Sequence, residues 1–284
     1  MNSTIIGTFN HTLISESECK TISDFSHENN SYSEFRIGDW KTYVIRSASG
    51  ENEDGLISSS SNKAIITPRG HALPLLNSWI DSMFDTSKLR LARIHSLGAG
   101  VLIPHRDFLE LGPKIPTWKR VHIPIKTNTQ CFHSEEDTVF RMRPGEIWLF
   151  DASRLHSAVN FSERQRLNLC LDFELGDEPT CSLLRNGLHH GTLYSPDIIQ
   201  RPPLNDEFYQ SLMGMSACLN EMNFRDVIGL LSKVHFYRRA TLSEFFDWLL
   251  EITTRSGNET LKYKAIAFTR FLRAERSMSE RFFL

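Results

Sequence analysis

The sequence predicts a mainly β core between an N-terminal α+β segment and a C-terminal helical region. Short apolar runs follow one another between residues 88 and 174, with turn residues between them, which is typical of a sandwich or barrel. After residue 179 the apolar residues recur at i, i+3, i+4 and i+7, which is typical of amphipathic helices. We therefore expect two domains, formed by residues 1–178 and residues 179–284.

The N-terminal segment contains a predicted strand, a predicted helix and a polar loop. Residues 39–47 (DWKTYVIRS) alternate in polarity like a short strand, and residues 73–84 place apolar side chains at helical spacing. Residues 57–62 are rich in serine. We expect these residues to form a mobile surface loop near a substrate entrance.

Local signals mark where the elements of the other two regions begin and end. In the β region, residues with turn propensity separate the apolar runs, and these are Gly98, Gly100, Gly145 and Asn160. In the helical region, the N-cap candidates are Asn205, Thr241 and Asn258, and Gly257 is a candidate helix stop.

Charge and cysteine usage narrow the class of protein. The net charge of −2 gives no electrostatic reason to expect nucleic acid or an anionic membrane as a partner. No apolar run reaches the roughly 18 to 20 residues of a membrane span, and the first residues lack the pattern of a signal peptide. The five cysteines are scattered and form no CxxC pair, so we expect reduced thiols and a cytoplasmic protein. The helical C-terminal part could pack over the sheet or form a dimer interface, so we expect either a monomer or a homodimer.

The stretch VLIPHRDFLELG places His105 and Asp107 at the end of an apolar run. Residues i and i+2 of a strand share a face, so the two side chains can meet at one point. An imidazole and a carboxylate are two of the three ligands of the facial triad in non-haem Fe(II) oxygenases. The candidate third ligand is His156, which follows the apolar run GEIWLFD. The alternative is a solvated His–Arg–Asp ion cluster on the surface.

Two further groups of residues fit the co-substrate of such an oxygenase. Arg166 follows His156 by ten residues and could bind the distal carboxylate of 2-oxoglutarate through its planar fork. Arg164 is a rival, because strand alternation puts it on the same face. Arg120 and His122 in WKRVHIPIK share a face and suit the carboxylate at the other end of the molecule. The alternative for His122 is a hydrogen-bonded histidine of the core.

The motifs together resemble the aspartyl/asparaginyl β-hydroxylase-type 2-oxoglutarate oxygenases. More narrowly, they are similar to the bacterial free L-proline cis-3- and cis-4-hydroxylases. The similar stretches of the β region are IPHRDFLEL, RVHIPI, HSEEDTVFRMRPGEIWLFDASRLHSAVNF and RLNLCLDF. In the C-terminal part, NFRDVIGLLSKVHFY and FFDWLLEI resemble the helical region of those enzymes, so the likeness covers most of the chain.

The resemblance implies a double-stranded β-helix (jelly roll) core with flanking N-terminal helices and a C-terminal helical region. It implies that Fe(II) is held by His105, Asp107 and His156. It also implies that Arg166 binds the C5 carboxylate of 2-oxoglutarate, with Arg120 and His122 at its other end. The reaction would consume O2 and hydroxylate a C–H bond of a free amino acid, with L-proline or a ring homologue such as pipecolate as the first expectation.

A free amino acid needs a cation for its carboxylate and an acceptor for its ammonium group. The candidate substrate residues are Arg93, His95, Arg106, His133 and Trp118. Glu135, Glu136 and Asp137 could line the mouth of the pocket, although SEEDT also reads as a solvated turn.

Other functions stay open from sequence alone. A linear basic amino acid such as lysine or arginine, or a peptidyl or carrier-bound residue, could be the substrate. A non-catalytic cupin-like binding module would need a broken metal site, and all three ligand positions are filled. A structural zinc site would have four protein ligands and no open position, often with cysteine, and no cysteine lies in the stretches that carry His105, Asp107 and His156.

Overall fold

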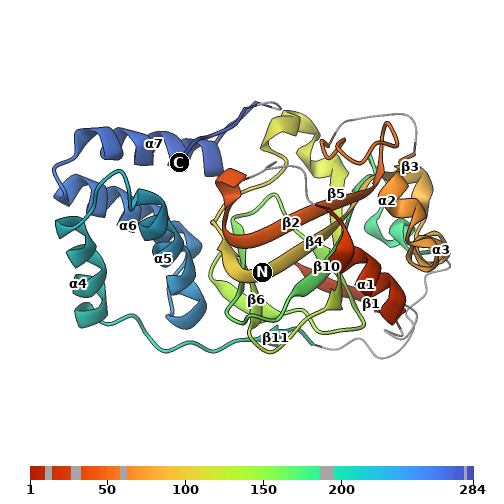
Figure 1. Ribbon diagram of the computed structural model, residues 1–284, viewed down its shortest axis with the longest axis horizontal. Helices are drawn as coiled ribbons and strands as arrows, with labels where there is room; N and C mark the ends of the chain where they lie inside the picture. Colours follow the sequence, from red (N-terminus) through yellow and green to blue (C-terminus); the bar gives the residue numbers. More distant parts are fainter. Residues whose placement is uncertain (10–14, 27–32, 58–62, 186–194, 278–279) are drawn as a thin grey trace.

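One curled antiparallel sheet forms the centre of the computed structural model, which describes residues 1–9, 15–26, 33–57, 63–185, 195–277 and 280–284 (Figure 1). Its strands are β1 (Thr4–Thr8), β2 (Arg36–Ser47), β3 (Ile65–Ile66), β4 (Leu89–Leu102), β5 (Trp118–Lys126), β6 (Cys131–Glu135), β7 (Thr138–Arg141), β8 (Glu146–Phe150), β9 (His156–Asn160), β10 (Arg166–Glu174) and β11 (Asp197–Ile198). The main path of hydrogen-bonded neighbours runs β1-β8-β5-β10-β4-β9-β6-β7-β11, and β2 pairs with β4 and β3. The predicted mainly β core of jelly-roll type is therefore confirmed.

Strands β4, β10 and β5 lie side by side and position most of the polar side chains that the sequence singles out. Cys170 on β10 lies opposite Arg93 on β4 and opposite His122 on β5. Two residues further along β10, Asp172 lies opposite Arg120. Because side chains alternate along a strand, this register gathers the polar groups on one face of the sheet.

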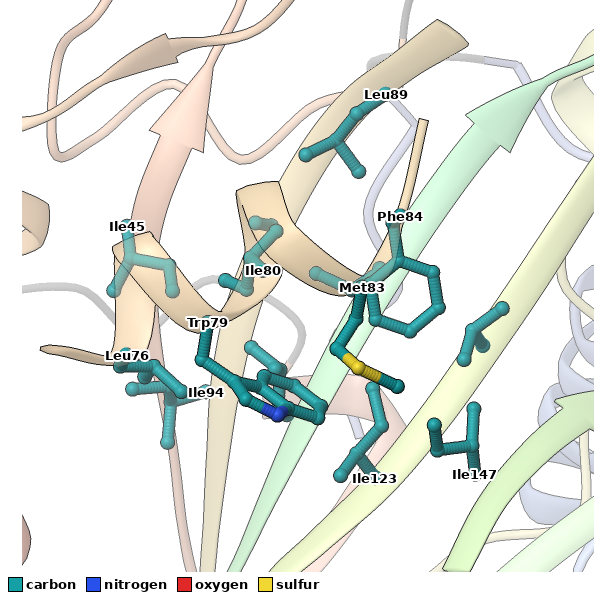
Figure 2. Close-up of a cluster of buried hydrophobic side chains, with 14 of the residues drawn as sticks. Ile45, Leu76, Trp79, Ile80, Met83, Phe84, Leu89, Ile94, Ile123 and Ile147 are labelled. Carbon is teal, nitrogen blue, oxygen red and sulfur yellow. The ribbon is translucent and has the colours of Figure 1, made fainter. Parts of the chain in front are cut away.

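The other face of these strands is apolar and is covered by α1 (Glu16–Asp24) and α3 (Pro74–Met83), while the short α2 (Pro68–His71) packs on β2 and β3. Figure 2 shows Trp79, Ile80 and Met83 of α3 packed among side chains of the sheet. The carboxylate of Glu18 accepts hydrogen bonds from the backbone N–H groups of Leu75 and Leu76, at 2.7 and 3.0 Å. A negative charge there satisfies free N–H groups of the first turn of α3 and complements the helix dipole.

Four helices form the C-terminal region: α4 (Asp206–Gly214), α5 (Phe224–Tyr237), α6 (Leu242–Arg255) and α7 (Glu259–Arg273). They pack around a hydrophobic cluster of their own, which also includes Phe35 and Ile103 from the β region (Figure 1). The predicted N-caps are confirmed, since Asn205 and Asn258 accept from the N–H groups of Phe208 and Leu261, and Thr241 forms a capping box. The division into two domains stays a prediction.

The predicted strand breaks at Gly98 and Gly100 are wrong, because β4 runs through both residues. A Cβ atom on Gly100 would lie 2.5 Å from the carbonyl oxygen of Ile37 and 3.2 Å from the Cα of Gly38. Glycine is thus required by the close approach of β2 rather than by a turn. Asn160 is the last residue of β9, and its side-chain amide donates to the carbonyl groups of Leu97 and Arg164.

Three other expectations can be placed on this fold. The strand predicted at residues 39–47 lies within β2, and the helix predicted at residues 73–84 is α3. Of the serine-rich run 57–62, residues 58–62 lie outside the described residues. Within the described part of the chain, no helix combines the length and apolar character needed to cross a bilayer.

Candidate active site

The side chains of His105, Asp107 and His156 meet at one end of a cavity inside the curled sheet. One candidate ligand atom from each of the three lies within 4.8 Å of the others. The segment after β4 reaches the start of β9, where the backbones of His105 and His156 exchange two hydrogen bonds of 3.1 and 2.9 Å. Asp107 is held there by its N–H group, which donates to the carbonyl oxygen of Ala152 at 2.8 Å.

The two imidazoles are oriented in the same way. Nδ1 of His105 lies 2.7 Å from the carbonyl oxygen of Ile103, and Nδ1 of His156 lies 2.9 Å from that of Arg154. Each Nδ1 therefore carries a proton, which leaves Nε2 as the nitrogen that can bind a metal. The Nε2 atoms point at the carboxylate between them, at 3.4 Å from Asp107 Oδ1 and 3.7 Å from Asp107 Oδ2.

The protonation states of this cluster suit a divalent metal. Burial lowers the pKa of His156 to about 3, and the neighbouring His105 acts in the same direction, so the ring is neutral at pH 7. Burial alone would raise the pKa of Asp107, but the Arg120 guanidinium holds it well below its usual range. Two neutral imidazoles and one carboxylate are the donor set of the Fe(II) facial triad. The residues present therefore fit such a metal.

Arg166 lines the same cavity and is a buried cation. Its Nη2 is 2.5 Å from Nε2 of His133, and no carboxylate of the described residues lies within 4 Å of its guanidinium. Burial lowers its pKa to about 10, so the group stays charged at pH 7. Burial and Arg166 hold the pKa of His133 well below its usual range. The His133 ring is therefore neutral and accepts a hydrogen bond from the Arg166 guanidinium. A buried charge without a counter-ion is costly, and an anionic ligand would offset that cost.

Arg120 and Arg93 share the fully buried carboxylate of Asp172. Arg120 Nε donates to Asp172 Oδ1 and Arg93 Nη2 donates to Asp172 Oδ2, both at 2.7 Å. Arg120 also donates to Asp107, and its guanidinium stacks over the ring of Phe108. Asp172 therefore fixes two guanidiniums beside the candidate metal ligands.

The remaining polar wall contains two neutral histidines. Burial, aided by Arg93 for His95 and by Arg120 for His122, holds the pKa of both well below the usual range. Asn168 and His122 contact each other through Nδ2 and Nδ1 at 2.5 Å. His122 Nε2 and Asn168 Oδ1 are buried in the cavity wall without a hydrogen-bond partner among the described residues, which fits a polar ligand placed beside them.

Several residues that the sequence singled out lie elsewhere. The side chain of Arg106 donates to the carbonyl oxygen of Ser153 at 2.7 Å and does not line the cavity. Trp118 packs in a small apolar cluster with Phe108 and is likewise absent from the cavity wall. Glu135 is fully buried and accepts from the N–H groups of the N-terminal residues 2 and 3, so it does not line a solvated mouth.

Arg164 and Arg166 differ in burial because of where β10 begins. Arg164 precedes the strand and is exposed, whereas Arg166 is its first residue and is buried. Sequence alternation alone could not separate them, because it assumed that the strand extended to both.

Sequence reasoning missed several polar residues around the cavity, among them Asn168, Asp172, Glu110 and Arg276. Asn168 and Asp172 follow Arg166 at even spacing on β10, so strand alternation could have found them. No motif signals Glu110, in the 3-10 segment η4 (Leu109–Thr117), or Arg276, which follows α7. Both nevertheless line the cavity.

Known proteins match the chain over most of its length. Residues 11–175 match the aspartyl/asparaginyl β-hydroxylase family, and residues 182–280 match the C-terminal part of L-proline 3-hydroxylase. The chain is 37% identical to L-proline cis-3-hydroxylase 2 of Streptomyces sp, over 89% of this chain and 88% of that protein. It is 36% identical to L-proline cis-4-hydroxylase of Rhizobium meliloti (strain 1021), over 91% of this chain and 90% of that protein. It therefore belongs to the aspartyl/asparaginyl β-hydroxylase family, among the relatives of the L-proline cis-hydroxylases.

Proposed function

We propose that this protein is an Fe(II)- and 2-oxoglutarate-dependent dioxygenase that hydroxylates a free L-amino acid, with L-proline or a ring homolog such as pipecolate as the substrate. The observation that carries the proposal is the shared cavity. It joins a His–Asp–His cluster to a buried arginine that has no carboxylate partner among the described residues. The names of the relatives, which act on L-proline, support the choice of substrate.

In this proposal His105, Asp107 and His156 hold Fe(II), which when bound supplies the activation of O2. The Nδ1–H groups of the two histidines donate to backbone carbonyls, and this keeps both Nε2 atoms turned toward the metal position. Asp107 supplies a negative charge. The Arg120 guanidinium holds it anionic and oriented.

The co-substrate has its own set of residues. Arg166 binds the C5 carboxylate of 2-oxoglutarate with its guanidinium, and neutral His133 keeps the fork in place. Arg120 and His122 lie toward the other end, where His122 Nε2 can donate to a ligand, because its Nδ1 accepts from Asn168 Nδ2. The net reaction converts one C–H bond, one O2 and one 2-oxoglutarate into one C–OH bond, one succinate and one CO2.

The charge of the cavity bears on the substrate class. Five arginines but only two carboxylates line it. This surplus of positive charge favours anionic ligands and disfavours a cationic side chain such as that of lysine or arginine. Location in the cytoplasm and a monomeric or homodimeric state stay predictions.

A substrate panel tests the proposal. The protein would be given Fe(II), 2-oxoglutarate and O2 with L-proline, L-pipecolate, L-lysine, L-arginine or a proline-containing peptide. We expect succinate, and a product heavier by one oxygen atom, with the cyclic amino acids. Hydroxylation of the peptide without turnover of any free amino acid would contradict the free amino acid assignment.

A further inference from the structure

The segment that follows α7 brings a cation into the cavity. Arg276 is 4% exposed at its side chain and lies in the same wall as the candidate metal ligands. Its guanidinium carbon lies 5.0 Å from the ring centroid of Phe35 and 5.7 Å from that of Phe271. Its Nη1 donates to the carbonyl oxygen of Phe271 at 3.3 Å. Stacking and a backbone contact thus fix the plane of the guanidinium.

The contacts of Arg276 leave one edge directed at the metal-ligand cluster. Nε donates to Oε1 of Glu110, and Nη2 lies 3.7 Å from Asp107 Oδ1. Nη2 makes no hydrogen bond to any described residue, and neither does Oε2 of Glu110. The cavity wall therefore contains a cationic donor, Arg276, next to an anionic acceptor, Glu110. Each of them can make a further hydrogen bond.

The other arginines of the cavity wall have polar partners of their own. Arg281 Nε lies 4.0 Å from Oε1 of Glu34. Arg93 and Arg120 share Asp172, and Arg120 also binds Asp107. Arg166 lies beside His133, where the proposed function assigns it to 2-oxoglutarate. Arg106, which the sequence offered as a cation for the substrate, does not line the cavity.

We propose that Arg276 and Glu110 form the binding site for the head group of the substrate, a zwitterionic amino acid. Arg276 binds the α-carboxylate through a charge-assisted hydrogen bond, and Glu110 accepts from the ammonium group. The inference rests on the proposed function, and it adds the residues that distinguish a free amino acid from a peptidyl residue, in which both charges are lost.

The proposal also gives the C-terminal region a role at the active site. The end of α7 is tied to the metal-ligand segment, because the N–H group of Arg106 donates to the carbonyl oxygen of Leu272 at 2.9 Å. Helix α7 thereby places Arg276 beside Asp107, and the helical region supplies part of the substrate pocket.

The test compares KM for L-proline among wild type, R276Q, R276K and E110Q. Losing a charge-assisted hydrogen bond should raise KM about 10- to 100-fold in R276Q. The KM of R276K should lie between those of R276Q and wild type, because lysine keeps the positive charge but lacks the planar guanidinium that binds a carboxylate with two N–H groups. R276K also keeps the proposal testable if R276Q does not fold.

Two substrate analogues separate the two residues. L-prolinamide lacks the carboxylate, and cyclopentanecarboxylate lacks the ammonium group. The preference of wild type for L-proline over L-prolinamide should shrink in R276Q, and its preference over cyclopentanecarboxylate should shrink in E110Q. Preferences that stay as in wild type in both variants would overturn the assignment of the head-group site.

R225Q is the matched control. Arg225 on α5 also joins the helical region to the β region, through the carbonyl oxygens of Ser33 and Arg36, but it does not line the cavity. An equal rise in KM in R225Q and R276Q would show that both merely loosen the C-terminal region, and would overturn the inference. A wild type that hydroxylates no free amino acid would instead contradict the proposed function.

Discussion

The two faces of strands β4, β5 and β10 have opposite chemistry, although they alternate residue by residue along the same backbone. On β10 the residues of one face are Leu167, Leu169, Leu171 and Phe173, all fully buried in the cluster under α1 and α3. The residues of the other face are Arg166, Asn168, Cys170 and Asp172, which are also buried. Both faces are shielded from bulk solvent, but only one of them is packed with apolar groups.

The difference separates stability from function within one strand. The apolar face gains free energy from burial of hydrocarbon, and it needs no ligand to be stable. The polar face places charged groups in a poorly solvated cavity, which costs free energy unless each charge has a partner. Asp172 has two arginine partners, whereas Arg166 has no carboxylate partner among the described residues. We expect substitutions on the two faces to affect different quantities.

The largest effect is expected at the metal-ligand cluster of the polar face. H156A removes one of the two candidate imidazole ligands and should reduce hydroxylation and succinate release to background, while the apolar face keeps the protein folded. Rates of product formation and a circular dichroism spectrum measure the two effects. A folded H156A with activity near that of wild type would refute the metal-site assignment.

A graded effect is expected at Arg166. R166A removes the buried partner proposed for the C5 carboxylate of 2-oxoglutarate and should raise KM for 2-oxoglutarate about 10- to 100-fold. R164A is the matched control, because Arg164 is exposed and lies two residues away. The assignment fails if R164A changes this KM as much as R166A does.

The sequence could predict those features whose signals lie within a short stretch of the chain. Alternation and helical periodicity are local, so the β core, α3 and the caps at Thr241 and Asn258 could be predicted. The His105–Asp107 pair has the same local character. The approach of Arg276 to Asp107 joins segments far apart in the chain, and no local pattern encodes it.

The wrong predictions have the same cause, because local patterns do not show which distant segments come into contact. Gly98 and Gly100 looked like strand breaks because the sequence does not show which neighbouring backbone requires a glycine. Arg106 is a candidate cation for the substrate because it lies between two candidate ligands, although strand alternation turns its side chain away from theirs. Its side chain points to the opposite side, toward Ser153 and the end of α7.

On the apolar face, the expected effect is on stability alone. L169A should lower the free energy of unfolding by about 2 to 5 kcal/mol, through lost burial and the cavity left behind. Denaturant unfolding measures this, and KM for 2-oxoglutarate should not change in the folded protein. L230A is the control, because Leu230 is 55% exposed and its truncation should cost far less. A similar loss in both variants would contradict the assignment of Leu169 to the core.

The smallest effect is expected at the ion pair that joins α3 to β2. Arg46 donates to both carboxylate oxygens of Asp81, at 2.8 and 3.1 Å. Burial alone would raise the pKa of Asp81, but Arg46 lowers it below the ordinary 3.8. Because the folded-state pKa is depressed, the pair should stabilise fully above about pH 5 and lose its contribution as the pH falls through that pKa.

D81N tests this pair. Asp81 is half exposed, so the loss at pH 7 should be under about 1 kcal/mol. Melting temperatures of wild type and D81N should differ at neutral pH and converge in acid. A difference that grows in acid would contradict the sign of the pKa shift.

The central claim is that one turnover joins the two ends of the cavity, one occupied by 2-oxoglutarate and the other by the amino acid. Supplying isotopically labelled O2 to the enzyme with L-proline tests this directly by mass spectrometry. The account predicts one labelled oxygen atom in the hydroxylated amino acid and one in succinate, formed in equal amounts. Hydroxylated product without labelled succinate, or product whose oxygen comes from water, would contradict it.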